Sequence, residues 1–271
     1  MGEGSMNVEW QLGSKSIRAR TLLLVGRTGN GKSATANMIL GRKAFKSRAS
    51  PSGVTSHSEI QQTVLRDGQI LKVIDTPGLF EFSSLSEFVG KEIIKSVDLA
   101  NDGIDAVLLV LSVRARFSAE EEATLSSLLT LFGRQIIDYM IIIFTGGDAL
   151  EDNGETLEDY LGRDCPIPLK EILELCKNRR VLFDNKTKDD CKRAEQLQQL
   201  ASLVNIIKLN NGGPLRDDLV SKCKEEAASS EQKILEVMDR ISSSYGEHFS
   251  RTMILEAFLV ALFLYRFCCF H

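Results

Sequence analysis

The sequence predicts an α/β domain of three layers, in which helices cover both faces of a mostly parallel sheet of six strands. Apolar runs alternate with segments of helical composition over roughly the first 210 residues, and this alternation is typical of that class. A glycine-rich loop joins the first apolar run, 21–25, to a helix-compatible segment. Asp67-Gly68 separates two further runs at hairpin spacing, which adds one antiparallel strand.

The remaining elements follow from their apolar pattern. Strands are expected over 21–25, 58–65, 70–74, 106–111, 139–144 and 179–183. The unbroken apolar runs 106–111 and 139–144 predict strands buried on both faces. Helices are expected over 34–40, 86–100, 118–132, 169–177 and 191–209. Ser118 precedes three glutamates and predicts an N-cap, whereas the acidic stretch 149–167 is expected to be a loop.

Composition limits the classes of function. The 271 residues carry a net charge of −4, so no basic field favours nucleic acid as a partner. The six cysteines form no C-x-x-C pair, which disfavours a zinc site, and residues 1–20 lack the apolar core of a secretory signal. We therefore expect a cytosolic protein with a flexible segment 1–16, a domain over 17–210, a helical, coiled-coil-like extension over 211–250 and a hydrophobic tail over 251–271.

The most specific motif is the stretch 26–33, Gly-Arg-Thr-Gly-Asn-Gly-Lys-Ser, which matches G-x-x-x-x-G-K-S. Its glycines allow backbone N–H groups to turn inward as an anion nest, and a helix N-terminus beside them favours phosphate. Lys32 is expected to reach the β- and γ-phosphates, and the Ser33 hydroxyl to bind Mg²⁺. The sequence thus predicts a nucleoside triphosphate site.

A second acidic motif, Asp75-Thr76-Pro77-Gly78, ends the strand 70–74. An aspartate at this edge of the sheet suits Mg²⁺ coordination through water, and the Gly78 N–H can face a γ-phosphate. The competing interpretation is an ordinary strand-to-loop turn, because Pro-Gly is common in turns.

Two further polar residues follow strands at the same edge and predict guanine as the base. The Asp148 carboxylate can accept hydrogen bonds from guanine N1–H and its amino group, whereas adenine would leave it unpaired. Asn185 can meet the O6 side of the base or hold its own loop. Either residue can also be a simple turn residue.

Together these motifs identify the chain as a member of the immune-associated nucleotide-binding (GIMAP/IAN) GTPases, which are septin-like and similar to the Toc GTPases of the chloroplast envelope. The resemblance spans about residues 18–210 and is nearest to the plant branch. It rests on GRTGNGKSATANMILG at 26–41, Thr55, DTPGLF at 75–80, LSVRARFSAEEEATL at 111–125, FTGGD at 144–148 and FDN at 183–185.

The resemblance implies a P-loop GTPase domain that binds GTP or GDP with Mg²⁺. Thr55 would sense the γ-phosphate and assist catalysis, and Ser33, Thr55 and Asp75 would hold Mg²⁺, Asp75 through water. The implied nucleotide-binding residues are Gly26, Arg27, Thr28, Gly29, Asn30, Gly31, Lys32, Ser33, Ala34, Thr55, Asp75, Gly78, Thr145, Asp148 and Asn185.

The sequence departs from the family pattern at two places. Gly146 and Gly147 stand where a basic residue usually covers the base, and Leu79 stands where Ras-like enzymes carry a catalytic Gln. Slow hydrolysis is therefore expected, with a homodimer through the nucleotide face supplying an arginine. Arg116 is favoured over Arg114 as that catalytic arginine, although both can be solvated loop charges. A GTP-gated scaffold with negligible hydrolysis and, less favoured, a P-loop ATPase remain as alternatives.

The hydrophobic tail leaves two interpretations open. Residues 253–270 are apolar apart from Glu256 and Arg266, which is short for a membrane span but long enough for an anchor whose Arg266 snorkels. Palmitoylation of Cys268 or Cys269 would strengthen the anchor on the cytosolic face of an intracellular membrane, the endoplasmic reticulum or another. Alternatively, the segment is an apolar helix that packs on the extension or on a partner.

Overall fold

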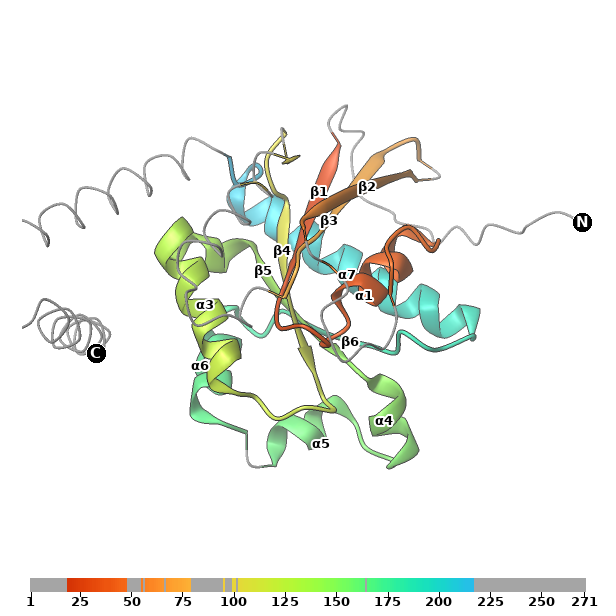
Figure 1. The fold of residues 1–271 in the computed structure, drawn as a ribbon, viewed down its shortest axis with the longest axis vertical. Coiled ribbons are helices and arrows are strands. Elements are labelled where there is room, and N and C mark those ends of the chain that lie inside the picture. The colour runs from red at the N-terminus through yellow and green to blue at the C-terminus, as the bar shows by residue number, and fades with distance from the viewer. Residues whose placement is uncertain are drawn as a thin grey trace, which may run out of the picture. The chain divides into compact units, whose positions relative to one another are not determined.

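The sheet of six strands has the order β2-β3-β1-β4-β5-β6, and only the β2–β3 pair is antiparallel (Figure 1). The structure is a computed structural model. It describes residues 19–47, 55, 57–65, 67–78, 95, 99–100, 102–163 and 165–216. The strands are β1 (Arg20–Val25), β2 (Glu59–Val64), β3 (Ile70–Asp75), β4 (Ala106–Ser112), β5 (Met140–Thr145) and β6 (Arg180–Phe183). The predicted fold class and the hairpin are confirmed.

Helices cover both faces of this sheet. Figure 1 shows α1 and α7 on one side of the strands and α3 and α6 on the other. The described helices are α1 (Lys32–Leu40), α3 (Ala119–Phe132), the 3-10 helix η1 (Arg134–Tyr139), α4 (Gly147–Asp152), α5 (Leu157–Gly162), α6 (Ile167–Leu175) and α7 (Asp190–Asn211). The three layers explain why β1 and β5 are buried along their whole length, as is β4 up to its last residue.

Parallel pairing brings the carboxyl ends of five strands to one edge. Leu24 of β1 is in register with Asp75 of β3, and Ser112 of β4 is in register with Thr145 of β5. Thr145 is in turn paired with Phe183 of β6. The segments that follow these strands therefore meet at this edge, where ligands bind in open α/β sheets.

One expected loop is instead helical. The stretch 149–167 contains the end of α4 and the whole of α5, so the loop prediction is wrong there. The α5 helix begins with a capping box in which Thr156 and Asp159 satisfy each other's backbone N–H groups. This S/T-x-x-D spacing is a start signal in the sequence that the acidic composition obscured.

Several sequence predictions fall outside the described residues. These are the flexible segment 1–16, most of the expected helix 86–100, the extension beyond residue 216 and the hydrophobic tail 251–271. Within the described part of the chain, no helix combines the length and the apolar character that crossing a bilayer requires.

Candidate nucleotide-binding site

The glycine-rich loop lies between β1 and α1, and tight packing fixes its shape. Gly26 has φ +143°, and a Cβ there would overlap the Val110 carbonyl oxygen of β4. Gly31 is the N-cap of α1 with φ +93°, and it provides no side-chain cap to the helix. The first turn of α1 itself contains no acidic residue, so the helix adds no negative charge of its own at its positive end. This arrangement suits a bound phosphate.

Lys32 is folded back over the loop. Its Nζ donates to the carbonyl oxygens of Gly26, at 2.9 Å, and of Arg27, at 3.1 Å. The residue is only 6% exposed. A buried ammonium group is thus held against the loop backbone, where it can compensate the negative charge of a bound phosphate.

Three oxygen-bearing side chains converge beside Lys32. Ser33 Oγ donates to Asp75 Oδ2 at 2.5 Å, and Thr55 Oγ1 lies 3.3 Å from Ser33 Oγ and 3.5 Å from Asp75 Oδ2. Asp75 is almost fully buried, and its Oδ1 has no hydrogen-bond partner among the described residues. Burial raises the pKa of Asp75 to about 6, against the lowering effects of Ser33 and Lys32. The structure therefore brings together the three residues predicted to hold Mg²⁺.

This donor set fits a magnesium ion. Mg²⁺ prefers hard oxygen ligands and is usually bound by one or two carboxylates together with substrate phosphates. A buried carboxylate with an unpartnered oxygen is costly by itself, and a cation next to it removes that cost. In the described ranges, no group of three or more His, Cys, Asp or Glu side chains offers another metal site.

Asn30 ties the loop to the neighbouring strands and to α3. Its Nδ2 donates to the Val110 carbonyl at 3.0 Å and to Glu121 Oε1 at 3.2 Å, and its own carbonyl accepts from Thr145 Oγ1 at 2.6 Å. Glu121 also accepts from the Ser118 backbone N–H at 2.9 Å, which completes the predicted cap of α3. Thr145, which was predicted to lie near the nucleotide, thus contacts the loop through the Asn30 carbonyl.

Asp148 lies in the first turn of α4, beside the end of β5. Its Oδ2 accepts from Arg114 Nη2 and, at 3.0 Å, from Lys186 Nζ. Partial burial raises the pKa of Asp148, but the two cations outweigh it and hold that pKa below its usual range. The carboxylate expected to recognise guanine is therefore ionised and oriented by two side chains from other loops.

Asn185 follows β6 and lies against the first helix. Its Nδ2 donates to Thr35 Oγ1 of α1 at 3.0 Å, while no residue in the described part of the chain hydrogen-bonds its buried Oδ1. The amide also lies close to the loop, since a Cβ at Gly31 would be 3.4 Å from Asn185 Nδ2. Asn185 thus joins the end of β6 to the start of α1.

Of the other residues that the sequence singled out, Gly78 lies against the loop. Gly78 is packed so tightly on Thr28 that a Cβ would come 2.5 Å from the Thr28 backbone nitrogen. Arg116 is exposed and forms no ion pair or hydrogen bond with any residue that the structure describes. Leu79 lies outside the described residues, so the second switch is seen only up to Gly78.

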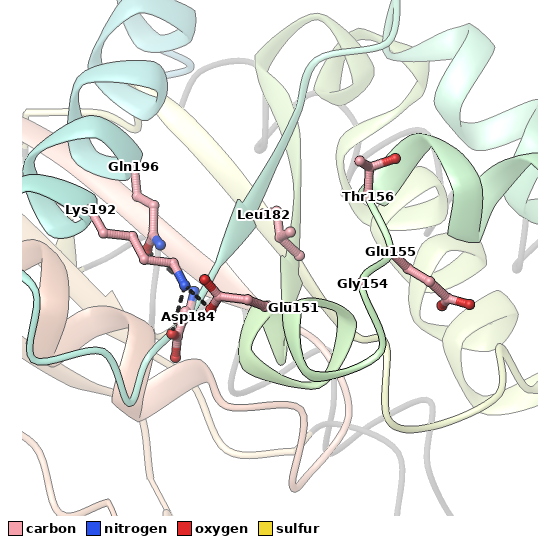
Figure 2. A pocket seen from close by; sticks show the side chains of 9 residues that line it. Glu151, Gly154, Glu155, Thr156, Leu182, Asp184, Lys192 and Gln196 are labelled. Atoms are coloured by element: carbon pink, nitrogen blue, oxygen red, sulfur yellow. Dashed lines mark hydrogen bonds and ion pairs between the residues drawn. The ribbon is translucent and has the colours of Figure 1, made fainter.

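A separate hollow of about 340 Å³ lies beside the guanine motif rather than at the phosphate loop. Figure 2 shows Lys192 of α7 reaching between Glu151 and Asp184. Lys192 Nζ is 2.5 Å from Glu151 Oε2 and 3.1 Å from Asp184 Oδ2. These ion pairs join α4 and the segment after β6 to α7. They thereby hold together the elements that carry the guanine motif.

Sequence reasoning missed the residues that hold the motifs in place. Glu121, Thr35 and Lys186 were not singled out, and Arg114 was considered only as a catalytic arginine. Glu121 lay within the capping signal that starts at Ser118, and Lys186 directly follows Asn185. No sequence pattern pairs residues that are 34, 38 or 91 positions apart, as these contacts are.

The sheet order, the loop between β1 and α1 and the oxygens beside Asp75 together define a P-loop GTPase fold. Two crystal structures of Toc33 from Arabidopsis thaliana share it, and in both the match covers 74% of this chain and 88% of that chain. A dimerization-deficient mutant of Toc33 superposes with a TM-score of 0.55 at 19% identity. The complex of Toc33 with GDP and Mg²⁺ gives 0.54 at 18% identity.

Residues 20–235 match the AIG1 family. The chain is 53% identical to immune-associated nucleotide-binding protein 9 of Arabidopsis thaliana over 254 residues, which cover 93% of this chain and 74% of that protein. The chain therefore belongs to the AIG1 family, and the resemblance to the immune-associated nucleotide-binding GTPases is confirmed.

Proposed function

We propose that this protein binds GTP and GDP with Mg²⁺ and hydrolyses GTP slowly, and that two copies associate through the nucleotide face to hydrolyse it faster. The observation that carries the proposal is the convergence of Ser33, Thr55 and Asp75 beside the buried Lys32. The binding of GDP and Mg²⁺ by Toc33, which shares the fold, supports it.

The phosphate end of the site binds charge without any large rearrangement. The loop backbone and the N-terminus of α1 cradle the phosphates, and the Lys32 ammonium turns from the loop carbonyls to them. Ser33, Thr55 and Asp75 hold the metal ion, which neutralises charge that develops on the β- and γ-phosphates. Thr55 comes from a different segment than the loop, so its contact reports whether a γ-phosphate is present.

The base end gives the preference for guanine. An ionised Asp148 accepts from N1–H and the amino group of guanine, and adenine offers an acceptor at N1 instead. The lowered pKa of Asp148 keeps this carboxylate charged at neutral pH. ATP should therefore bind much more weakly than GTP.

In the proposed reaction a second copy supplies a group that assists hydrolysis. The described residues place no glutamine beside the phosphate loop, and Arg116 is exposed and unpaired among them. An arginine provided by a second molecule can raise the rate by about 10³–10⁵. For the chloroplast translocon components Toc33 and Toc159, dimerization is important for GTPase activity.

The test is GTP turnover per molecule of the full chain over a wide range of protein concentration, with ATP in parallel. We expect specific activity to rise with concentration for GTP alone. In Arg116→Ala this rise should disappear, whereas Arg163→Ala, which changes another exposed arginine, should behave like the wild type. Slow turnover that does not change with concentration, with GTP still bound, would favour a GTP-gated scaffold. Preference for ATP would overturn the assignment of Asp148.

We also propose that residues 251–271 attach the protein to the cytosolic face of an intracellular membrane. The proposal rests on the apolar composition of residues 253–270, with Glu256 and Arg266 towards either end. Deletion of residues 251–271 should move the protein from the membrane fraction to the supernatant. If fractionation is unchanged, the segment packs on protein instead.

A further inference from the structure

Arg114 lies in a turn that is fastened to the end of β5. The Val113 backbone N–H donates to the Thr145 carbonyl at 3.0 Å, and the Ala115 N–H donates to the Ser112 carbonyl at 3.2 Å. The Arg114 N–H itself donates to Ser112 Oγ at 3.2 Å. The backbone of Arg114 is therefore fixed next to the segment 145–148.

The side chain of Arg114 occupies the space next to Gly146. A Cβ added at Gly146 would lie 3.3 Å from both Cγ and Nε of Arg114, and 3.0 Å from Val113 Cγ2. Gly146 also has φ +89°, a conformation that favours glycine. The glycine that replaces the usual basic residue of the guanine motif thus leaves room for a basic side chain from the end of β4.

The guanidinium of Arg114 continues from Gly146 to Asp148, where it pairs with Oδ2. Lys186 pairs with the same oxygen, but its side chain is 72% exposed, compared with 46% for Arg114. No described residue donates to the other carboxylate oxygen, Oδ1. Arg114 is therefore the better-held of the two cations, and Asp148 keeps one oxygen open to a ligand.

We propose that Arg114 is a specificity-determining residue for guanine, which orients Asp148 towards the base and covers the base with its planar side chain. Arginine suits this function because its guanidinium pairs with a carboxylate and stacks on aromatic rings. The inference rests on the proposed function, because it needs a guanine nucleotide at Asp148. It also leaves Arg116 as the arginine that reaches a second copy.

The inference explains how a guanine motif works with two glycines. In this chain the basic residue comes from the turn after β4, and Gly146 leaves room for it, whereas Gly147 faces Leu182 and Asp184. Arg114 and Asp148 are 34 residues apart, yet β4 and β5 are adjacent strands, so the pair spans neighbouring strand ends. The contribution of Arg114 is then to base preference and not to the phosphate chemistry.

The test uses the full chain as wild type, Arg114→Ala, Arg114→Lys and Lys186→Ala, which removes the other cation beside Asp148, with Lys43→Ala as the exposed control. Equilibrium dissociation constants for GDP and ADP are measured by competition with a fluorescent GDP analogue. We expect Arg114→Ala to weaken GDP binding about 10-fold or more, the loss typical of a charge-assisted contact, with little change for ADP. Arg114→Lys should recover part of the loss, and Lys186→Ala should change GDP binding less than about threefold.

Other results would overturn the inference. These are a dissociation constant for GDP in Arg114→Ala within about twofold of the wild type, an equal loss for GDP and ADP, or a larger effect in Lys186→Ala. A lower turnover number with unchanged affinity would instead make Arg114 a catalytic arginine. Failure of the proposed function is distinguishable, because the wild type itself would then show no preference for GDP over ADP.

Discussion

The phosphate end and the base end of the site differ in the groups that form them and in how deeply these groups are buried. At the phosphate end, a glycine loop packs on the β4 backbone, and the buried side chains of Lys32 and Asp75 lie beside it. At the base end, the charged side chains of Arg114, Asp148 and Lys186 meet near the surface. The first arrangement is rigid because main-chain atoms cannot move aside, whereas the second is held by exposed ion pairs that substitutions can exchange.

The largest expected difference concerns the glycines at the two ends. Gly26→Ala should lower the free energy of unfolding by about 2–4 kcal/mol, because its Cβ meets the backbone oxygen of Val110. Gly146→Ala should cost only about 1–2 kcal/mol, since its Cβ meets movable side chains and the main penalty is its positive φ. Gly29→Ala, with nothing within 4 Å, gives the baseline for positive φ alone.

Urea denaturation of the three glycine variants measures these differences. If Gly26→Ala and Gly29→Ala lost equal stability, the close contact with β4 would not matter. The phosphate end would then be no more rigidly packed than the base end.

A second difference should appear in binding. Lys32→Ala should weaken GDP binding by about 10- to 100-fold, since one charge-assisted contact to phosphate is lost, and should leave the ratio of GDP to ADP affinity unchanged. Asp148→Ala should lower that ratio by at least about tenfold, because only guanine uses this carboxylate. Isothermal titration with both nucleotides separates the effects, and Lys43→Ala serves as an exposed control. A changed ratio in Lys32→Ala would contradict the separation of the two ends.

Glu121 tests whether α3 supports the phosphate end. Glu121→Ala removes the acceptor of Asn30 Nδ2 and the cap of α3, and should lower the free energy of unfolding by about 1–3 kcal/mol. Glu122→Ala, at the exposed neighbouring position, should change it by less than about 0.5 kcal/mol. Thermal and urea unfolding give both values, and equal losses would show that the buried link is unimportant.

The smallest expected effect is a change in protonation at the base end. The pKa of Asp148 lies below 3.8 because Arg114 and Lys186 outweigh its partial burial, so Arg114→Ala should raise that pKa towards 3.8. A lowered pKa in the folded state means that the ion pairs stabilise the fold above about pH 4 and lose this contribution as the pH falls through the folded pKa.

Carboxyl ¹³C shifts followed by NMR would give the pKa of Asp148 in both proteins. Because the cluster is largely exposed, added salt should shrink the difference between them. An Asp148 pKa that is equal in the wild type and in Arg114→Ala would show that the pair does not persist in solution.

Most of the fold and the phosphate end follow from the sequence. The runs that form β1, β4 and β5 are apolar without a break because both faces of the sheet are covered, and the glycine loop is recognisable because its function depends on backbone conformation. Asp75 was predictable as well, since a strand end next to the loop determines its position. Such signals are local, so the sequence displays them directly.

Composition and chain order were weak guides to two features of the structure. The acidic stretch 149–167 forms helices because Thr156 and Asp159 cap α5, a signal of two residues within a polar background. The hydroxyl of Thr145 donates to the Asn30 carbonyl, a contact that chain order does not reveal because the two residues are 115 positions apart. In both places a specific hydrogen bond, and not the general polarity, decides the structure.

By itself, the sequence determined the family and the sheet, and it singled out Ser33, Thr55 and Asp75, whose side chains meet in the structure. Only the tertiary structure decided which cations orient Asp148 and how Glu121 reaches Asn30. Arg114, Asp148 and Lys186 are charged residues on separate surface segments, and the sequence offers many alternative pairings for each of them. Their partners are selected by the order of β4, β5 and β6 in the sheet, because adjacent parallel strands bring their following loops to the same edge.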